Sequence, residues 1–410
     1  MTEGKRRCAL QRAAETCIIR PAMTVWIVNP FDNLPLEGCR PQRYWLMARA
    51  FARSGHATTY WTSDFSHARK APRDLGCVSS ASNMMTDDGF RLTLVPTMPY
   101  PSNICLRRIW SHRAFAHSWL QMAKKADVRP DVVIASLPPL SSCKAACVFC
   151  HGIGARFVVD IMDAWPETFY RLAPAWLFAP LRSTARHIYR SADAVTAVAS
   201  RYLDMARSYG ATSPMYLCHH GIELPERCTQ HTVRNERHGA LKLIYIGSMG
   251  ASYDLETVVE AVAKMDDVEL DLAGAGPKEP SLRKLAADCP RIRFHGYLGD
   301  AEVRGLLEMA DAGIVPMFPD SCVGVPYKLA DYAAAGLRVL NSLPGETEKL
   351  LDKFKAGVSY EAGNMVSFTR AVQRLRQPES IDAAAFGQLF DAGRLYGGYV
   401  DFIEKEVLQK

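Results

Sequence analysis

Short apolar runs alternate with helical patterns along most of the chain, and this alternation constrains the fold more than any other feature. An apolar run followed by a segment with apolar residues on one helical face is typical of parallel α/β layers. The alternation runs through the first half of the chain and starts again in the second half. We predict strands at 25–28, 57–61, 92–95, 131–135, 156–161 and 194–197, and then at 241–246, 268–273, 292–295, 312–315 and 338–341.

A polar, charged stretch from 225 to 240 separates the two halves, and its lack of apolar periodicity indicates a linker. We therefore predict two doubly wound, Rossmann-like α/β domains, over 23–225 and 241–385, with a cleft between them. Ligands of such folds bind at the carboxyl ends of the strands. Residues 386–410 are predicted to form a helix that crosses back toward the first domain. Residues 1–22 are interpreted as a basic N-terminal extension without the apolar core of a secretory signal.

Composition narrows the class of protein and of partner. The chain has 410 residues, of which 48% are hydrophobic and 22% charged, as in an ordinary globular protein. No apolar run reaches the ~18–20 residues of a membrane span. Residues 1–200 hold 25 Lys and Arg against 14 Asp and Glu, while the whole chain has a net charge of +6. A basic first half predicts an anionic partner, a phosphorylated substrate or an acidic lipid, and the absence of a recognition motif argues against nucleic acid.

Twelve cysteines are scattered along the chain, mostly beside apolar residues, which favours reduced thiols in a cytoplasm. Cys143, Cys147, Cys150 and His151 form a cluster that could suit an iron–sulfur centre or a haem. The three cysteines also follow the i, i+4, i+7 spacing of one helix face, and cysteine is among the most buried residue types. We therefore prefer core packing and predict no metal site.

The segment from Val325 to Leu340 predicts a helix that can hold a diphosphate. Its Pro-x-Lys start places Lys328 in the first turn, and small residues lead to Gly336, a usual helix stop. The free N–H groups of a helix start, its dipole and one cation together suit a diphosphate. Asp331 lies on the same face, where its carboxylate can accept hydrogen bonds from ribose hydroxyls. The segment favours a nucleotide-diphosphate sugar as ligand; the alternative is an amphipathic helix before a buried strand.

Two glycine-containing turns precede this segment in the second half. Gly247 and Ser248 follow one predicted strand, and Gly274 and Gly276 follow the next. Glycine at a strand-to-helix turn lets the backbone approach phosphate oxygens. We predict that both turns contact the nucleotide; the alternative for each is a plain tight turn.

One loop of the first half offers further ligand contacts. Gly38 lies where the chain enters a helix predicted at 40–54, and either Arg40 or Arg43 could meet a phosphate there. We select Arg43 as the donor contact. The alternative for each arginine is a solvated side chain at a helix start.

Carboxylates follow a buried strand of the same half, at Asp160, Asp163 and Glu167. Acids at the carboxyl end of a strand face the cleft in this architecture. There a carboxylate could act as a base toward an acceptor hydroxyl or stabilise positive charge on a sugar. We select Asp163 for this role; the alternative is that it caps a helix.

Together these segments resemble a retaining glycosyltransferase of family 4, which has the GT-B fold. The resemblance is closest to the subgroup that assembles bacterial cell-surface polysaccharides such as O-antigen or capsule. The shared stretches follow one another from Trp26 to about Ser342. They include Pro-Asp-Val-Val-Ile-Ala-Ser at 130–136, Asp-Ala-Trp-Pro-Glu at 163–167, Gly-Ile-Glu at 221–223 and Phe-His-Gly-Tyr at 294–297.

The resemblance implies that the second domain binds the donor and that no cofactor is needed beyond the nucleotide sugar as co-substrate. Asp331 stands for the second Glu of the family's E-x7-E motif, whereas Val323 stands where the first Glu would face the sugar, so the donor sugar stays open. With the patterns above, Asp163 and Lys328 are the expected catalytic residues. The expected donor-binding residues are Gly38, Arg43, Gly247, Ser248, Gly274, Gly276, His295, Gly296, Tyr297, Val325, Lys328 and Asp331.

The expected reaction is transfer of a hexose or N-acetylhexosamine from a nucleotide diphosphate, UDP by preference, to an acceptor hydroxyl with retention at the anomeric carbon. The expected acceptor is a glycan, most simply a lipid-linked one, and the expected location is the cytoplasm. Two alternatives stay open. One is a sugar-nucleotide 2-epimerase of the same architecture, and the other is a non-catalytic protein that binds sugar nucleotides.

The segment 106–120 combines several arginines with Trp and Phe. Such a helix can lie on an anionic membrane, here the inner face of the plasma membrane, while its aromatic side chains enter the interface. The alternative is a core-packing helix whose arginines are solvated.

Overall fold

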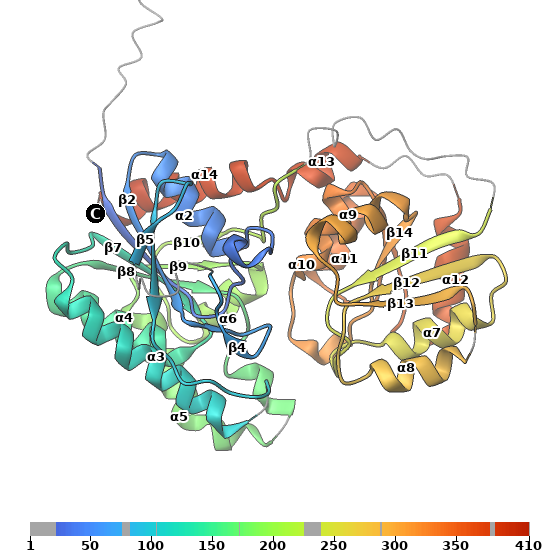
Figure 1. Ribbon diagram of the computed structural model, residues 1–410, viewed down its shortest axis with the longest axis horizontal. Coiled ribbons are helices and arrows are strands. Elements are labelled where there is room, and N and C mark those ends of the chain that lie inside the picture. Colours follow the sequence, from blue (N-terminus) through green and yellow to red (C-terminus); the bar gives the residue numbers. More distant parts are fainter. Residues whose placement is uncertain are drawn as a thin grey trace, which may run out of the picture.

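Two α/β units lie side by side in the molecule, each built on its own sheet (Figure 1). The computed structural model describes residues 22–75, 83–103, 105–171, 173–224, 239–287, 289–377 and 382–409. Both sheets are mostly parallel, which confirms the predicted fold class. Nearly all of the predicted extension and linker lies outside the described residues.

The first unit is an eight-stranded sheet with helices on both faces. Trp26 and Val28 point into one core, while the alternating Val25 and Ile27 point into the other. Helices α3 (Leu106–Lys125), α4 (Leu140–Ile153) and α5 (Ala179–Ser191) pack on the first core, and α2 (Arg43–Arg53) packs on the second. The strand order is β10 (Met215–Leu217), β9 (Ala194–Ala197), β8 (Arg156–Ile161), β7 (Val132–Leu137), β1 (Thr24–Val28), β2 (Ala57–Ser63), β6 (Arg91–Val95) and β5 (Asn83–Met85).

Short elements complete the first unit. A two-stranded sheet pairs β3 (Phe65–Ser66) with β4 (Ala71–Pro72). The remaining helices are α6 (Ser200–Ser208) and the 3-10 turns η1 (Pro35–Glu37), η3 (Glu167–Arg171) and η4 (Ala175–Phe178).

The second unit is a six-stranded parallel sheet. Its strand order is β13 (Ile292–Gly296), β12 (Val268–Ala273), β11 (Leu241–Ile246), β14 (Ala312–Val315), β15 (Arg338–Asn341) and β16 (Gly357–Ser359). Its helices are α7 (Leu255–Ala263), α8 (Glu279–Ala286), α9 (Asp300–Met309), α10 (Tyr327–Ala334), α11 (Glu346–Phe354), α12 (Met365–Leu375) and α13 (Ala383–Gln388), with the 3-10 turn η6 (Pro319–Ser321).

Every predicted strand is a strand in the structure, with ends that differ by two residues at most. Sequence patterns missed the short strands β3, β4, β5, β10 and β16. Each has two or three residues, which is too short to show a period.

The last helix, α14 (Ala392–Phe402), continues into a π-helical turn (Ile403–Val407) and lies along the first unit, beside α2 (Figure 1). Tyr396 and Tyr399 are buried in the core of that unit. The Tyr399 hydroxyl lies 2.9 Å from the Thr196 hydroxyl of β9. The chain thus returns to its first sheet after completing the second.

The cysteine cluster lies on α4, where Cys143, Cys147 and Cys150 are buried in the core, as their spacing predicts. Among the described residues, no group of three or more His, Cys, Asp or Glu side chains is arranged to hold a metal ion. Within the same described ranges, no helix is both long and apolar enough to cross a membrane.

Helix α3 is buried in its later turns and exposed at its start. Phe115 and Trp119 are buried in the core of the first unit. Leu106, Ile109 and Trp110 of the first two turns are exposed, by 76%, 49% and 57%. The core-packing interpretation therefore holds for the later turns, and an apolar surface remains at the start of the helix.

Candidate active site

The candidate site lies where the strand order of the second sheet reverses, between β11 and β14. Gly247 and Ser248 follow β11, and Lys328 lies in the first turn of α10, which comes between β14 and β15. The loops diverge at such a point and leave room for a ligand outside the carboxyl ends of the strands. The fold therefore brings together two segments that lie 80 residues apart in the chain.

Lys328 is a buried lysine whose Nζ has no polar partner in the part of the chain that the structure describes. Only 6% of the residue is exposed, and among the described residues its Nζ has no hydrogen-bond or ion-pair partner. The Nζ lies 4.0 Å from the centre of the Tyr245 ring and 4.1 Å from that of Tyr253. Burial lowers the pKa of Lys328 well below its ordinary value, and the charge of Asp331 opposes this shift incompletely. A buried cation left in this state is poised to receive an anion.

Gly247 leaves the space beside this cation open. Gly247 and Ser248 are exposed, and a Cβ at Gly247 would lie 3.4 Å from the Lys328 Nζ. The residue has a φ of +128°, which side chains rarely adopt. Any other residue would crowd the position that an anion on Lys328 would take.

The second glycine turn leaves room for the backbone of the first one. Gly274 has a φ of +135°, and a Cβ there would lie 1.9 Å from the Gly247 carbonyl oxygen. A Cβ at Gly276 would lie 2.5 Å from the Met249 carbonyl oxygen. The neighbour that these two glycines admit is the loop at 247–249, and their contact with a phosphate stays a prediction.

Asp331 is occupied by an arginine of the first unit. Arg40 donates two hydrogen bonds to its carboxylate, one of them 3.0 Å long between Nη2 and Oδ2. Burial raises the pKa of Asp331 above its ordinary value, and Arg40 opposes that rise. The predicted ribose contact would have to share this carboxylate with Arg40 or displace it.

Changing Asp331 to Asn tests the predicted ribose contact. We expect about a tenfold loss of affinity for UDP, because an amide replaces a charged acceptor. The loss should be much smaller for a UDP analogue that lacks the 2′ and 3′ hydroxyls, as measured by calorimetry on both ligands. Equal losses would show that Asp331 serves the contact with Arg40 and does not read the ribose. Arg40→Gln, which removes that contact alone, is the control.

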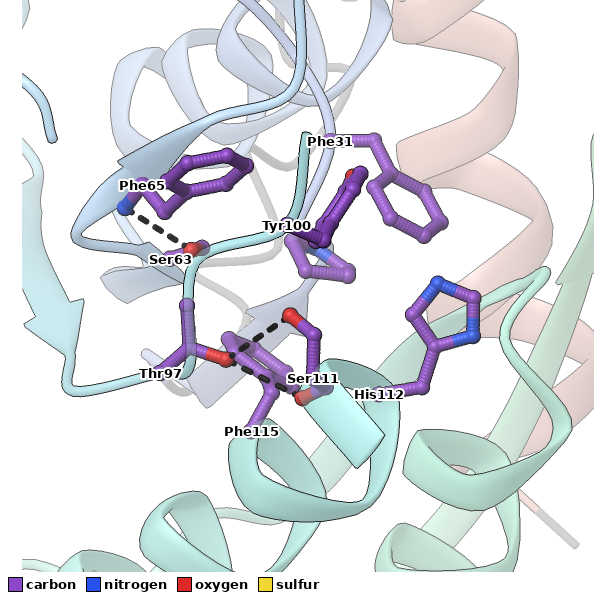
Figure 2. Close-up of a pocket in the computed structure, with 9 residues that line it drawn as sticks. Phe31, Ser63, Phe65, Thr97, Tyr100, Ser111, His112 and Phe115 are labelled. Atoms are coloured by element: carbon purple, nitrogen blue, oxygen red, sulfur yellow. Dashed lines mark hydrogen bonds between the residues drawn. The ribbon is translucent and has the colours of Figure 1, made fainter. Parts of the chain in front are cut away.

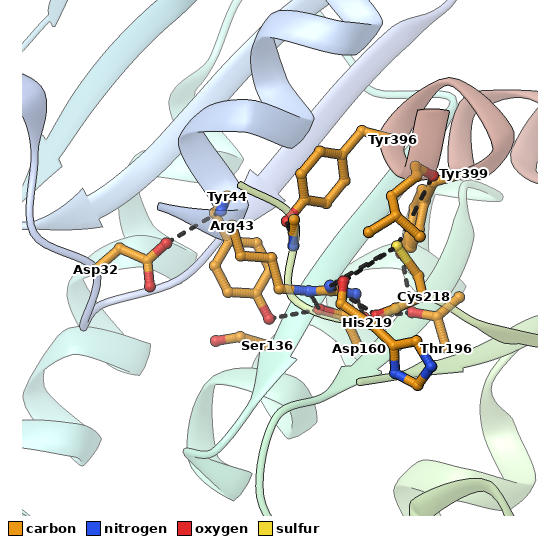
Figure 3. A network of polar contacts seen from close by, with 12 residues as sticks. Asp32, Arg43, Tyr44, Ser136, Asp160, Thr196, Cys218, His219, Tyr396 and Tyr399 are labelled. Atoms are coloured by element: carbon orange, nitrogen blue, oxygen red, sulfur yellow. Dashed lines mark hydrogen bonds and ion pairs between the residues drawn. The ribbon is translucent and has the colours of Figure 1, made fainter. Parts of the chain in front are cut away.

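Arg43 is not available to a ligand, which corrects its selection as a donor contact. The residue is fully buried, and its Nε and Nη2 each lie 2.8 Å from a carboxylate oxygen of Asp160 (Figure 3). Its Nη1 donates to the carbonyl oxygens of Cys218 and His219, at 2.9 and 3.0 Å. Burial alone would raise the pKa of Asp160, but Arg43 and hydrogen bonds hold it below its ordinary value. Arg43 therefore secures the segment that leads out of the first unit.

The first turn of α10 is tied to that same segment. The Tyr327 ring stacks on His220 with their centres 3.7 Å apart. The Tyr327 hydroxyl accepts a hydrogen bond of 3.0 Å from the backbone N–H of Arg43. Sequence patterns gave no signal for these contacts, because their partners lie far apart in the chain.

Asp163 lies past the carboxyl end of β8 and reaches solvent. Burial by the surrounding protein still raises its pKa to about 6, while Arg108 opposes the rise. The negative charge of Asp163 also raises the pKa of Tyr253, after the larger effect of burial. The Tyr253 ring in turn contacts the Lys328 Nζ.

The other predicted donor residues differ in their access to this site. Gly38 is exposed with a φ of +75°, and Tyr297 is 71% exposed. His295 is engaged with Asp271, at 2.7 Å from its carboxylate. The Gly296 carbonyl accepts from the Gly274 N–H at 2.7 Å. Val325 is 2% exposed and packs in the core, so its side chain cannot contact a ligand.

Comparison with known proteins assigns both units. The family model described as Glycosyltransferase Family 4 matches residues 43–226, and the one described as Glycosyl transferases group 1 matches residues 240–377. A curated relative, the sulfoquinovosyl transferase of Arabidopsis thaliana, is 23% identical over 201 residues. That match covers 47% of this chain and 39% of the relative, so this chain spans well under half of the relative's length.

Solved structures agree in fold. Sucrose-phosphate synthase from Thermosynechococcus elongatus superposes with a TM-score of 0.67 at 13% identity, over 94% of this chain and 97% of that one. The Anabaena protein HepE in complex with UDP superposes with a TM-score of 0.63 at 12% identity, over 93% and 99% of the two chains.

Each unit has its own α/β sheet, and the candidate site lies where the strand order of the second sheet reverses. Together with the agreement in fold with solved structures, this arrangement defines a GT-B protein. Because the two glycosyltransferase models together cover most of the chain, it belongs to the glycosyltransferases, with a family 4 domain followed by a group 1 domain.

Proposed function

We propose that this protein transfers a hexose or N-acetylhexosamine from a UDP sugar to an acceptor hydroxyl, with retention at the anomeric carbon. The observation that carries the proposal is the buried Lys328 Nζ, which lacks a polar partner among the described residues and lies beside the open backbone at Gly247. A diphosphate would supply the missing anion. The structural neighbour HepE, solved with UDP and also with UDP-glucose, supports the choice of nucleotide.

In this proposal the chain acts by positioning and by electrostatics. Lys328 and the Ser248 N–H stabilise negative charge on the leaving diphosphate, whereas the Gly247 N–H is donated to the Ala273 carbonyl oxygen. The acceptor hydroxyl attacks on the same face of the sugar, and the leaving phosphate helps to take its proton. Asp163 is ionised above a pH of about 6 and stabilises positive charge on the sugar. No cofactor beyond the nucleotide sugar is required.

A screen of nucleotide sugars tests the proposal. A donor should raise the melting temperature, since a ligand that binds only the folded state stabilises it. UDP release that requires an acceptor would then establish transfer. A 2-epimerase would convert the donor without an acceptor, and a non-catalytic binding protein would leave it unchanged. Failure of every UDP sugar to bind would contradict the proposal.

We also propose that the acceptor is a lipid-linked glycan and that the protein works at the cytoplasmic side of an anionic membrane. Leu106, Ile109 and Trp110 form an exposed apolar surface at the start of α3, flanked by Arg107 and Arg113. The Arg113 guanidinium lies 5.5 Å from the centre of the Trp110 ring. Apolar side chains beside arginines suit an anionic interface.

Changing both Arg107 and Arg113 to Gln should reduce co-sedimentation with phosphatidylglycerol vesicles several-fold, because each basic residue near the surface contributes about 1 kcal/mol. Binding of the unchanged protein should weaken with salt. The matched control changes Arg370 and Arg374, two exposed arginines on α12 of the second unit. Binding that ignores lipid charge, or an equal loss in the control, would refute the membrane contact.

A further inference from the structure

A group of basic and aromatic side chains lies beside Asp163 in the first unit and has no part in the donor site. We call it the Arg108 cluster. Its members come from the loop after β1, the segment between β3 and β4, the loop after β6, the start of α3 and the loop after β8. They are Phe31, His67, Lys70, Tyr100, Arg108, His112 and Trp165.

Both cations of the cluster lie over aromatic rings. The Arg108 guanidinium lies 5.7 Å from the centre of the Phe31 ring and 5.9 Å from that of Trp165. The Lys70 Nζ lies 5.3 Å from the centre of the Tyr100 ring. Rings and cations that alternate in this way present both an apolar face and positive charge to a ligand.

Among the described residues, no carboxylate forms an ion pair with the cations of the cluster. Other buried arginines of this unit have carboxylate partners, as Arg43 has Asp160 and Arg73 has Glu37. Within the part of the chain that the structure describes, neither Lys70 nor Arg108 forms an ion pair. The carboxylate that acts on Arg108 is Asp163, through a longer-range interaction.

The two histidines of the cluster do not offset this charge. Burial, then Lys70 and Arg108, lowers the pKa of His67 to about 3. Burial and Arg108 lower the pKa of His112 to about 3 as well. Both rings are therefore neutral near pH 7, and they can still donate or accept hydrogen bonds.

The cluster borders a narrow cavity at the carboxyl ends of β1, β2 and β6 (Figure 2). Figure 2 shows His112 rising from α3 toward the Phe31 ring, whose centre lies 5.3 Å away. Tyr100 lies between Phe31 and Phe65 in the same view. Lys70 has a φ of +56°, a conformation that costs energy in a residue other than glycine. The loop thus holds Lys70 at this position in a conformation that it would not adopt by preference.

We propose that the Arg108 cluster binds the acidic group of the acceptor sugar, so that this transferase acts on an acceptor that carries a phosphate or a carboxylate. The inference rests on the proposed function, and it adds the chemical class of the acceptor. Lys70 and Arg108 pair with the acid, and the half-buried Trp165 ring packs on the apolar face of the sugar. Asp163 acts electrostatically on Arg108, so in this proposal an acceptor held here lies on the side of the carboxylate that stabilises the transferred sugar.

Three matched ligands test the proposal on the full chain with UDP at saturation, so that the donor site is filled. They are a methyl hexoside, its 6-phosphate and the corresponding uronide. We expect either acidic ligand to bind at least about tenfold more tightly than the neutral one, as a charge-assisted contact would provide. Arg108→Gln and Lys70→Gln should each remove about tenfold of that preference. Arg107→Gln, at the exposed neighbouring position, should leave it unchanged.

The outcomes distinguish the chemical class of the acceptor and the site at which it binds. Preference for the phosphate alone identifies a phosphorylated acceptor, and preference for the uronide alone identifies a carboxylate sugar. Equal binding of neutral and acidic ligands overturns the proposal, as does an equal loss in Arg107→Gln. A loss confined to Lys328→Ala overturns it too, because the ligand would then lie in the donor site. Failure of UDP to bind refutes the proposed donor and, with it, the acceptor role of the cluster, whereas intact UDP binding without acid preference refutes the cluster alone.

Discussion

Replacing Lys328 with alanine is expected to weaken UDP binding at least tenfold while the protein stays folded. A charge-assisted contact to a phosphate contributes about 1.5–3 kcal/mol. Folding should not suffer, because the buried Nζ has no polar partner among the described residues. Calorimetry gives the affinity and thermal unfolding gives the stability. Lys353→Ala, at an exposed position on α11 of the same unit, is the control.

Calorimetry on the unchanged protein would also detect the uptake of a proton when UDP binds. Burial lowers the pKa of Lys328 far below its ordinary value, and a phosphate beside it would raise that pKa again. UDP binding should therefore take up a proton at any pH that lies between the pKa of the free lysine and that of the bound one. The measured enthalpy should change with the ionisation enthalpy of the buffer, and Lys328→Ala should remove much of that dependence. Unchanged affinity in the variant would refute the donor site.

The second large effect is expected at Asp160, the buried partner of Arg43. Asp160→Ala would strand a fully buried guanidinium and is expected to cost about 3–5 kcal/mol of unfolding free energy. Denaturant unfolding measures it. The control is Asp204→Ala, which breaks the exposed pair with Arg207 and should cost at most about 1 kcal/mol. A cost at Asp160 as small as that of the control would show that water reaches Arg43.

A double substitution distinguishes the loss of the ion pair from the burial of an unpaired charge. Replacing Arg43 with Met and Asp160 with Leu removes both charges together. It should be less damaging than Asp160→Ala, because no buried charge is left alone.

The strands could be predicted because each carries its own apolar run, as at 241–246 and 268–273. The position of Lys328 followed in the same way, from a helix start after such a strand. Arg40 and Arg43 could not be distinguished, because each lies at the start of one helix and their fates depend on distant partners. Asp160 is 117 residues from Arg43, and Asp331 is 291 residues from Arg40.

The glycines show the same limit. Gly274 marks a place where another backbone comes close, which its residue type does indicate. Nothing in the local sequence says whether the close neighbour is another part of the protein backbone or a ligand. The structure supplies the Gly247 carbonyl as the neighbour.

The contact between Tyr327 and the first unit has a mechanical consequence. Tyr327 precedes Lys328 directly, stacks on His220 and accepts a hydrogen bond from the N–H of Arg43. Any separation of the two units must therefore break these contacts or carry the first turn of α10 along. The relative position of the units and the placement of the Lys328 side chain then change together, so this lysine is positioned for a diphosphate only while the contacts of Tyr327 are kept.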